Sequence, residues 1–417
     1  MESSLVREKS VPKGIYTILA IAGLVLLCVN PHFTQGHDNM NVLLNAAMCL
    51  SPAVLLLKRG RVVITRVDLP FGIMILCVIL FPLLFHRETI RLSTMLFLCA
   101  YCVYIMMLAR LVRVAEIDSL VLCKVIRWIV YSYAIVLVIQ QICVLLGWTV
   151  PMWSIPYQDP YKLNSLMPEP SQTSLVLGIL MYFYTQTLIS RNSDYTLWEC
   201  IRESPVTWIC YIWTISTTHN ATMLLFGPLF LLPFINRKSW PWYLAAGLAL
   251  IVTLWIIPSG KFVRLDRVRN FGVALPSLDE RKMLAADTSI SARVLPTLHG
   301  AELIDMSNLD TYIGHGVDAE RRDTPPAPCG ERRTGSAGIF NIWYNYGLPS
   351  ALAFWAGIFI LTIIKGRPLT ILTFALAFIL SGDYNVQFVW MVLAFSMVYK
   401  YSICGERRLL ETISGNG

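Results

Sequence analysis

Charged residues are scarce in this chain of 417 residues. Asp, Glu, Lys and Arg make up 14% of it, whereas they make up roughly 25% of an average soluble domain. Hydrophobic residues reach 56%, and the mean hydropathy is +0.59. The apolar stretches between the charges approach the ~20 residues that cross the hydrocarbon core of a bilayer. This pattern excludes an ordinary soluble domain and predicts an all-α protein that crosses a membrane many times.

Signatures of cofactor and nucleic-acid binding are also missing. The sequence contains no zinc-ligand cluster, no glycine-rich phosphate loop and no dinucleotide-binding fingerprint. We therefore expect no metal and no other cofactor. The net charge of +8 arises mostly from basic residues beside the apolar stretches, so we do not expect nucleic acid as a partner. Of the eleven cysteines, only Cys329 falls in the long polar segment described below, which excludes a disulfide within that segment.

Twelve apolar stretches predict about twelve transmembrane helices. The first ends at Asn30-Pro31-His32-Phe33, which does not resemble the cleavage site of a signal peptide, so we expect it to be retained. Two pairs of stretches, divided at 217–220 and 381–385, are short enough to be broken or tilted helices. The predicted spans are 15–30, 40–57, 69–85, 92–109, 128–147, 172–190, 205–218, 221–235, 241–257, 340–364, 368–380 and 386–400.

Basic residues predict the orientation of these helices. Twenty of the 34 Lys and Arg residues lie at the two termini and in alternate loops, and eleven lie in one long polar segment. The other short loops hold only Arg87, Arg91 and Lys162. Because short cytoplasmic loops are enriched in Lys and Arg, we expect both termini in the cytoplasm and the long segment outside it.

The long polar segment, 258–338, divides the chain into three parts. We expect residues 1–257 to form an N-terminal membrane domain, 258–338 an external loop, and 339–417 the C-terminal membrane helices with a cytoplasmic tail. Loops much longer than about 15 residues are usually either functional or disordered. We expect this one to be the working part of a membrane enzyme whose substrate is already activated, because ATP and sugar nucleotides are confined to the cytoplasm.

The first candidate for chemistry is the motif Met167-Pro168-Glu169-Pro170-Ser171-Gln172. Pro170 suits the first position of a helix, which places Glu169 at the N-cap and Gln172 where a capping box would use it. The helix dipole stabilises a carboxylate at this end. Glu169 is either a capping acid at the membrane surface or a fixed carboxylate that accepts a proton or orients a sugar hydroxyl, with Ser171 beside it.

The second candidate is the polar run Ser216-Thr217-Thr218-His219-Asn220, which interrupts an apolar stretch. Such side chains are costly in lipid, so they either face a polar cavity or form a plain turn at the membrane surface. If they face a cavity, His219 is a substrate ligand.

The long segment supplies the third set of candidates. Arg293 follows Ser291 in a stretch that we expect to be helical up to Pro296, and the turn Gly314-His315-Gly316 precedes Arg321 and Arg322. A guanidinium matches phosphate oxygens with two parallel hydrogen bonds, and the glycines allow backbone to approach a ligand closely. Eleven acids balance the eleven basic residues of this segment, so each arginine is either a ligand or a solvated surface charge.

The fourth candidate opens the tenth predicted span. Asn341 and Asn345 are one helical turn apart and point to the same side, with Tyr344 between them. Trp and Tyr at a helix start are also typical of the membrane interface, and this location would explain the motif without a substrate.

In this order, the four motifs resemble those of the O-antigen polymerase and O-antigen ligase superfamily. The matching features are Glu-Pro-Ser after an outward loop, a hydroxyl-rich broken helix pair, a large outward loop with Ser-x-Arg and Gly-x-Gly, and Asn-x-Tyr-Gly-Leu at the next helix. They extend from Asn164 to Pro349. The ligases of this superfamily carry a histidine before the late Gly-Leu, where this chain has Phe340-Asn341. His219-Asn220 also departs from the Ser-x-Ser-Arg of many relatives.

The resemblance implies a metal-independent enzyme of the bacterial inner membrane with a GT-C-like glycosyltransferase fold. Its substrates would be glycans linked to undecaprenyl diphosphate, with Arg293 and either Arg321 or Arg322 near the diphosphate and Glu169 near the acceptor. His315, Asn341, Tyr344 and Asn345 would complete the binding site. A chain-length regulator and a flippase are expected partners. The missing histidine favours a polymerase over a ligase. The competing hypotheses from other functional classes are a transporter or flippase and a non-catalytic assembly subunit.

The orientation can be tested with cysteines at Ser277 and Lys238. In a Cys329→Ala background, a membrane-impermeant maleimide applied to spheroplasts is expected to label the cysteine at 277, and to label that at 238 only after the membrane is opened. The reason is the bias of basic residues toward the predicted cytoplasmic loops. The reverse pattern of labelling would contradict the predicted orientation.

Overall fold

The computed structural model describes most of the chain and consists, within that part, of helices. The described residues are 13–31, 41–56, 67–115, 117–152, 162–192, 195–218, 221–235, isolated positions between 241 and 256, 263–323, 338–364, 370–375 and 386–414. The helices of the N-terminal part are α1 (Lys13–Cys28), α2 (Val42–Leu56), α3 (Asp68–Phe85), η1 (Arg87–Thr89), α4 (Leu92–Ala115), α5 (Ser119–Leu146), α6 (Pro170–Arg191), α7 (Leu197–Glu203), α8 (Pro205–Thr217), α9 (Ala221–Phe226) and η2 (Gly227–Phe234). Those that follow are α11 (Val263–Ala274), η3 (Leu275–Ser277), α12 (Glu280–Ala286), α13 (Thr288–Leu303), α14 (Asp310–Ile313), α15 (Ala319–Asp323), α16 (Gly338–Thr362) and α18 (Gln387–Ser414).

Five of these helices, α3, α4, α5, α6 and the 340–362 part of α16, are long and apolar enough to cross a membrane. The protein is therefore a helical membrane protein, as the sequence predicts. The predicted spans 205–218 and 221–235 correspond to α8, which has 13 residues, and to α9 followed by the 3-10 helix η2. Most of 241–257 and 368–380 lies outside the described residues. The total of twelve spans stays a prediction.

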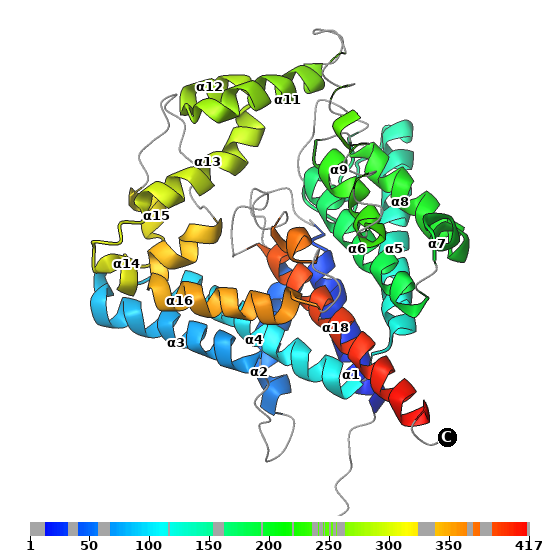
Figure 1. Ribbon diagram of the computed structural model, residues 1–417, viewed down its shortest axis with the longest axis horizontal. Helices are drawn as coiled ribbons and strands as arrows, with labels where there is room; N and C mark the ends of the chain where they lie inside the picture. Colours follow the sequence, from blue (N-terminus) through cyan, green and yellow to red (C-terminus); the bar gives the residue numbers. More distant parts are fainter. Residues whose placement is uncertain are drawn as a thin grey trace, which may run out of the picture.

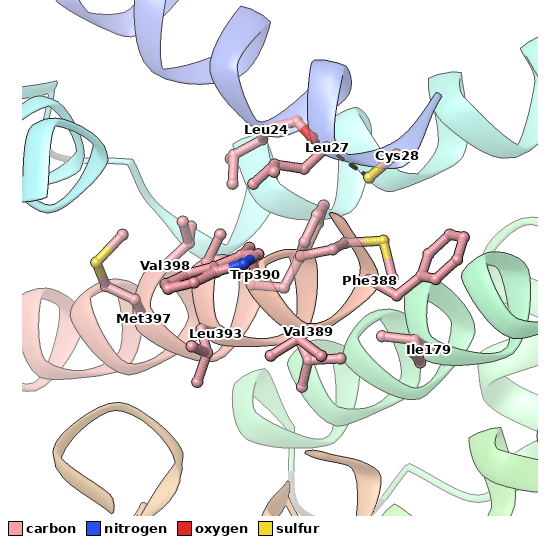
Figure 2. Packing of buried hydrophobic residues seen from close by; sticks show 14 of the residues in the cluster. Leu24, Leu27, Cys28, Ile179, Phe388, Val389, Trp390, Leu393, Met397 and Val398 are labelled. Atoms are coloured by element: carbon pink, nitrogen blue, oxygen red, sulfur yellow. Dashed lines mark hydrogen bonds between the residues drawn. The ribbon is translucent and has the colours of Figure 1, made fainter. Parts of the chain in front are cut away.

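Helix α18 runs through the centre of the bundle. The last predicted span, 386–400, coincides with the first half of α18. Residues 388–399 of this helix are all buried. The indole of Trp390 stacks on Tyr101 of α4, with ring centroids 5.1 Å apart and planes 5° from parallel. Figure 2 shows Trp390 facing α1, while Val389 and Leu393 point to the opposite side of α18. A helix that is apolar on every side is one that its neighbours enclose.

Contacts between helix ends define two faces of the bundle. On one face, Arg110 at the end of α4 pairs with Asp68 at the start of α3 (3.3 Å), and Lys400 donates a hydrogen bond to the carbonyl of Ile363 just after α16 (3.1 Å). On the other face, Asn41 before α2 donates to Gln387 at the start of α18 (2.8 Å). The start of α3 lies beside the end of α4 because consecutive helices run in opposite directions.

The broken helix pair around 217–220 packs against α6. Gly178 of α6 lies against Phe226 so closely that an added Cβ would overlap the Phe226 carbonyl. The hydroxyls of Ser174 in α6 and Thr218 after α8 lie 2.7 Å apart. The predicted polar run is therefore partly inside the protein, next to the start of α6. His219 and Asn220 lie outside the described residues.

The long polar segment forms helices, and one differs from the prediction. We expected the helix around Arg293 to end at Pro296, but α13 continues to Leu303. Proline removes one backbone donor and disfavours a helix interior. Here α13 is held by packing against α16 and by Leu295 in a small apolar cluster with Met283 and Phe271. These tertiary contacts outweigh the tendency of Pro296 to end the helix.

Figure 1 shows how this segment lies relative to the membrane helices. Helices α3 and α16 run side by side, and α14 and α15 lie at the start of α16, near the end of α3. Helices α11, α12 and α13 form a separate group that reaches the bundle through α13. The long segment is thus attached to the end of the bundle at which α16 begins.

Candidate functional site

The turn Gly314-His315-Gly316 binds a break in helix α16. Gly347 inside α16 has φ 81° and ψ 168°, which interrupts the helix. In a regular helix the Asn345 carbonyl would accept from residue 349, but residue 349 is a proline and has no N–H. The turn supplies donors at this break. The N–H of Gly316 donates to the Asn345 carbonyl (3.2 Å), and the N–H of His315 donates to the neighbouring Tyr344 carbonyl (2.8 Å).

Glycines permit this approach of two backbones. Gly314 and Gly316 have φ values of +88° and +97°, and a Cβ added to Gly347 would overlap the Tyr312 carbonyl. Both conditions, positive φ and close backbone, exclude larger side chains. The sequence predicts that these glycines let backbone approach a ligand; the structure shows that the backbone they approach is that of α16.

Side chains extend this contact into a polar chain. The His315 ring stacks on Tyr344, with centroids 3.9 Å apart, and the Tyr344 hydroxyl donates to Asp323 (2.9 Å). The Arg322 Nε donates to the other oxygen of Asp323 (3.1 Å), and its Nη2 donates to the His315 carbonyl (3.3 Å). Arg322 is exposed, so its guanidinium is oriented by protein acceptors on one side and open to solvent on the other.

Asn341 and Asn345 lie on the same side of α16, as their spacing predicts. The Asn345 amide donates to the Asn341 side-chain oxygen and accepts from the N–H of Glu320 in α15 (3.2 Å). Both asparagines are buried. In this structure they attach α15 to α16, and their predicted role as substrate ligands stays a prediction.

Sequence reasoning missed a contact that holds the other side of the turn. Arg91, before α4, pairs with Asp318 (3.0 Å), which also accepts from Thr94 (3.4 Å). Asp318 has a positive φ of 55°, and Gly316 lies against Thr89. The available signal was that Arg91 is one of three basic residues in the short outward loops. The turn is therefore clamped between the α3–α4 connection and α16.

Glu169 belongs to a second group of residues. It is the N-cap of α6, with Pro170 at the first helical position, as predicted. The predicted capping box is wrong, because the Glu169 side chain caps no backbone N–H. The carboxylate instead accepts a hydrogen bond from the Ser171 hydroxyl (3.0 Å). The residue is half-buried.

A buried amide network fixes the backbone that leads to Glu169. Gln140 of α5 accepts from the N–H of Ser165 (2.9 Å) and donates to Asn164 (3.3 Å). The Asn164 amide in turn donates to the Met167 carbonyl. Buried amides of this kind must be paired, and their pairing makes the approach to α6 a single defined conformation.

The two remaining predicted residues are placed only by their backbones. Arg293 lies in α13 and Arg321 in α15, while their side chains, like His219, lie outside what the structure describes. The structure thus unites His315, Arg322, Tyr344 and both asparagines in one cluster, which we call the turn–helix cluster. It places Glu169 with Ser171 in another group.

No family model, no curated protein and no solved structure matches this chain.

Gly347→Ala is expected to destabilise the turn–helix cluster, because the residue combines positive φ with contact to the Tyr312 carbonyl. Strained backbone alone costs on the order of 1–3 kcal/mol, and the overlap adds to it. Gly147→Ala is the matched control, since Gly147 also has positive φ but an added Cβ there would meet open space. Thermal unfolding of the purified protein measures both. Equal melting temperatures for the two variants would contradict the predicted backbone contact.

Proposed function

We propose that this protein is a polysaccharide polymerase that joins oligosaccharide repeat units carried on undecaprenyl diphosphate. The reaction would take place at the outer face of the bacterial inner membrane, in a chain of about twelve spans with a GT-C-like fold. The proposal rests on the order of the four motifs between Asn164 and Pro349. Its main support from the structure is that two motifs separate in sequence, Gly314-His315-Gly316 and Asn341–Asn345, form one cluster that carries an exposed arginine.

The proposed reaction transfers a growing glycan to a new repeat unit. A hydroxyl of the acceptor sugar attacks the anomeric carbon of the donor glycan and forms the new C–O bond. The bond between that carbon and the diphosphate oxygen breaks, and the diphosphate leaves with the electron pair. The hydroxyl proton goes to a carboxylate, for which Glu169 is our candidate.

Arginine side chains would stabilise the charge that develops on the diphosphate. Arg293 is our candidate from the Ser-x-Arg motif, and the geometry of Arg322 supports it as a second ligand. Asp323 and the His315 carbonyl occupy the Nε and one Nη group of Arg322, so other guanidinium N–H groups remain for phosphate oxygens. Fixed donors that meet developing charge are usually the largest contribution to catalysis of this type.

Other functions remain as competing proposals. Phe340 at the start of α16 stands where the ligases of the superfamily carry a histidine, which favours the polymerase over an O-antigen ligase. A transporter or flippase would place charged residues near the middle of its spans, and the sequence has few there. A non-catalytic assembly subunit would require neither Glu169 nor Arg293.

Deletion of the gene tests the class of enzyme. We expect cells without the protein to accumulate single lipid-linked repeat units and no long chains, because a polymerase acts before any chain exists. Electrophoresis of extracted lipid-linked glycans measures this. Accumulation of long lipid-linked polymer would indicate a ligase, and unchanged glycans would exclude both activities.

Complementation with Arg293→Lys tests the diphosphate ligand. Lysine keeps the charge but loses the planar fork of donors, and a charge-assisted hydrogen bond contributes roughly 1.5–3 kcal/mol. We therefore expect polymerisation to slow by about tenfold to a hundredfold. Arg281→Lys, at an exposed position of α12, is the control and should not change the rate. Normal chain lengths from normally abundant Arg293→Lys protein would remove Arg293 from the site.

A further inference from the structure

The stretch 305–313, which ends in helix α14, carries exposed apolar side chains although it belongs to the polar segment. Leu309 is 69% exposed, Met306 51% and Tyr312 38%. Tyr312 lies in α14, Leu309 is the N-cap of α14 and Met306 precedes it. None of the three joins either apolar cluster of the described residues. Large apolar groups gathered on one surface mark contact with a partner or a membrane.

The position of α14 along α16 favours a membrane over a protein partner as the contact of this surface. The Trp343 indole N–H donates to the Thr311 carbonyl (3.0 Å), and Gly347 lies against the Tyr312 carbonyl. Both Trp343 and Gly347 fall within the candidate membrane span of α16. The part of α16 after the break rises about 22 Å at 1.5 Å per residue, short of the ~30 Å hydrocarbon core. The break, and α14 with it, therefore lies at or inside the outer boundary of that core.

Helix α3 gives a second and independent marker of depth. Its candidate span ends at Phe85, and the next residues, His86 and Thr89, touch Gly316. The turn that follows α14 is thus level with the end of α3, where Phe85 is itself exposed. Figure 1 shows α14 beside this end of α3 and the start of α16. Two membrane helices place α14 at the same level.

The backbone of α14 is suited to a lipid environment. The N–H groups of Tyr312, Ile313 and Gly314 donate to carbonyls of Leu309 and Asp310, and the Tyr312 hydroxyl donates to the Met306 carbonyl (3.2 Å). Exposed backbone at membrane depth must be paired internally in this way. We propose that Met306, Leu309 and Tyr312 form a lipid-contacting patch, which inserts α14 into the outer boundary of the bilayer among phospholipid acyl chains.

Acidic residues beside the patch limit how deeply it inserts. The hydroxyl and the N–H of Ser307 donate to Asp305 (2.7 and 2.9 Å), and these hydrogen bonds hold the pKa of Asp305 below its usual value. Its carboxylate stays charged and remains in the hydrated headgroup layer. The attachment is therefore apolar and shallow. It holds the turn–helix cluster at the depth of lipid headgroups, whether or not the proposed reaction takes place there.

Site-specific photo-crosslinking tests the patch in the full-length protein. p-Benzoylphenylalanine is incorporated at Leu309, and the protein is placed in nanodiscs that contain radiolabelled phosphatidylethanolamine and phosphatidylglycerol. Leu96 of α4 (61% exposed) is the positive control for lipid contact, and Leu278 after η3 (65% exposed) is the matched control in the polar segment. We expect lipid labelling at 309 to equal that at 96 and to exceed that at 278 several-fold.

Three outcomes would overturn the proposal. They are labelling at 309 no higher than at 278, formation of a protein–protein adduct in place of a lipid adduct, and loss of lipid labelling in high salt, which screens charges but not apolar contacts. If the variant at 309 fails to fold, as judged by size-exclusion chromatography, the probe at Met306 gives the same comparison. Because the nanodiscs contain no lipid-linked glycan, the result does not depend on the proposed enzyme activity.

Discussion

The structure depends on the pairing of two carbonyl groups inside a membrane helix. Pro349 lacks an N–H, so the Asn345 carbonyl loses its usual partner within the helix, and Gly347 interrupts α16 two residues after Asn345. At membrane depth each unpaired backbone group costs several kcal/mol. The N–H groups of His315 and Gly316 satisfy the Tyr344 and Asn345 carbonyls. The break in α16 and the turn in the polar segment are therefore joined by backbone hydrogen bonds into one structure.

This pairing determines the positions of the neighbouring elements. It aligns the His315 ring with Tyr344, which brings Asp323 within reach of the Tyr344 hydroxyl and so orients Arg322. On its other side, the same turn reaches Arg91 through Asp318, 227 residues away in sequence. The polar segment is thus not an independent domain beside the membrane. Its residues 310–323 belong to the end of the bundle at which α16 begins.

Much of the fold could be predicted from local patterns. Apolar length locates α1 to α6 and α18, Pro170 locates the start of α6, and helical spacing places Asn341 and Asn345 on one side. The sequence does not predict features that depend on contacts between residues far apart in the chain. Packing carries α13 past Pro296. The position of Arg91 in a short outward loop marked it as unusual, but its partner Asp318 lies 227 residues away and could not be predicted from the local sequence. The approach of the Gly-x-Gly turn to a ligand stays a prediction, but nothing in its own sequence reveals that its N–H groups pair with carbonyls of α16.

The turn–helix cluster separates groups that build the site from groups that remain available to a substrate. Asn341 and Asn345 are buried and bind each other and α15, and removing either would leave a buried amide unpaired, at a cost of roughly 1–3 kcal/mol. Loss of activity in such variants would therefore not identify a ligand. Arg322 is different, because it is exposed and only part of its guanidinium is occupied by protein acceptors. Among the described residues of this cluster, it is an exposed cation, and under the proposed function it is the side chain that remains available to an anionic substrate.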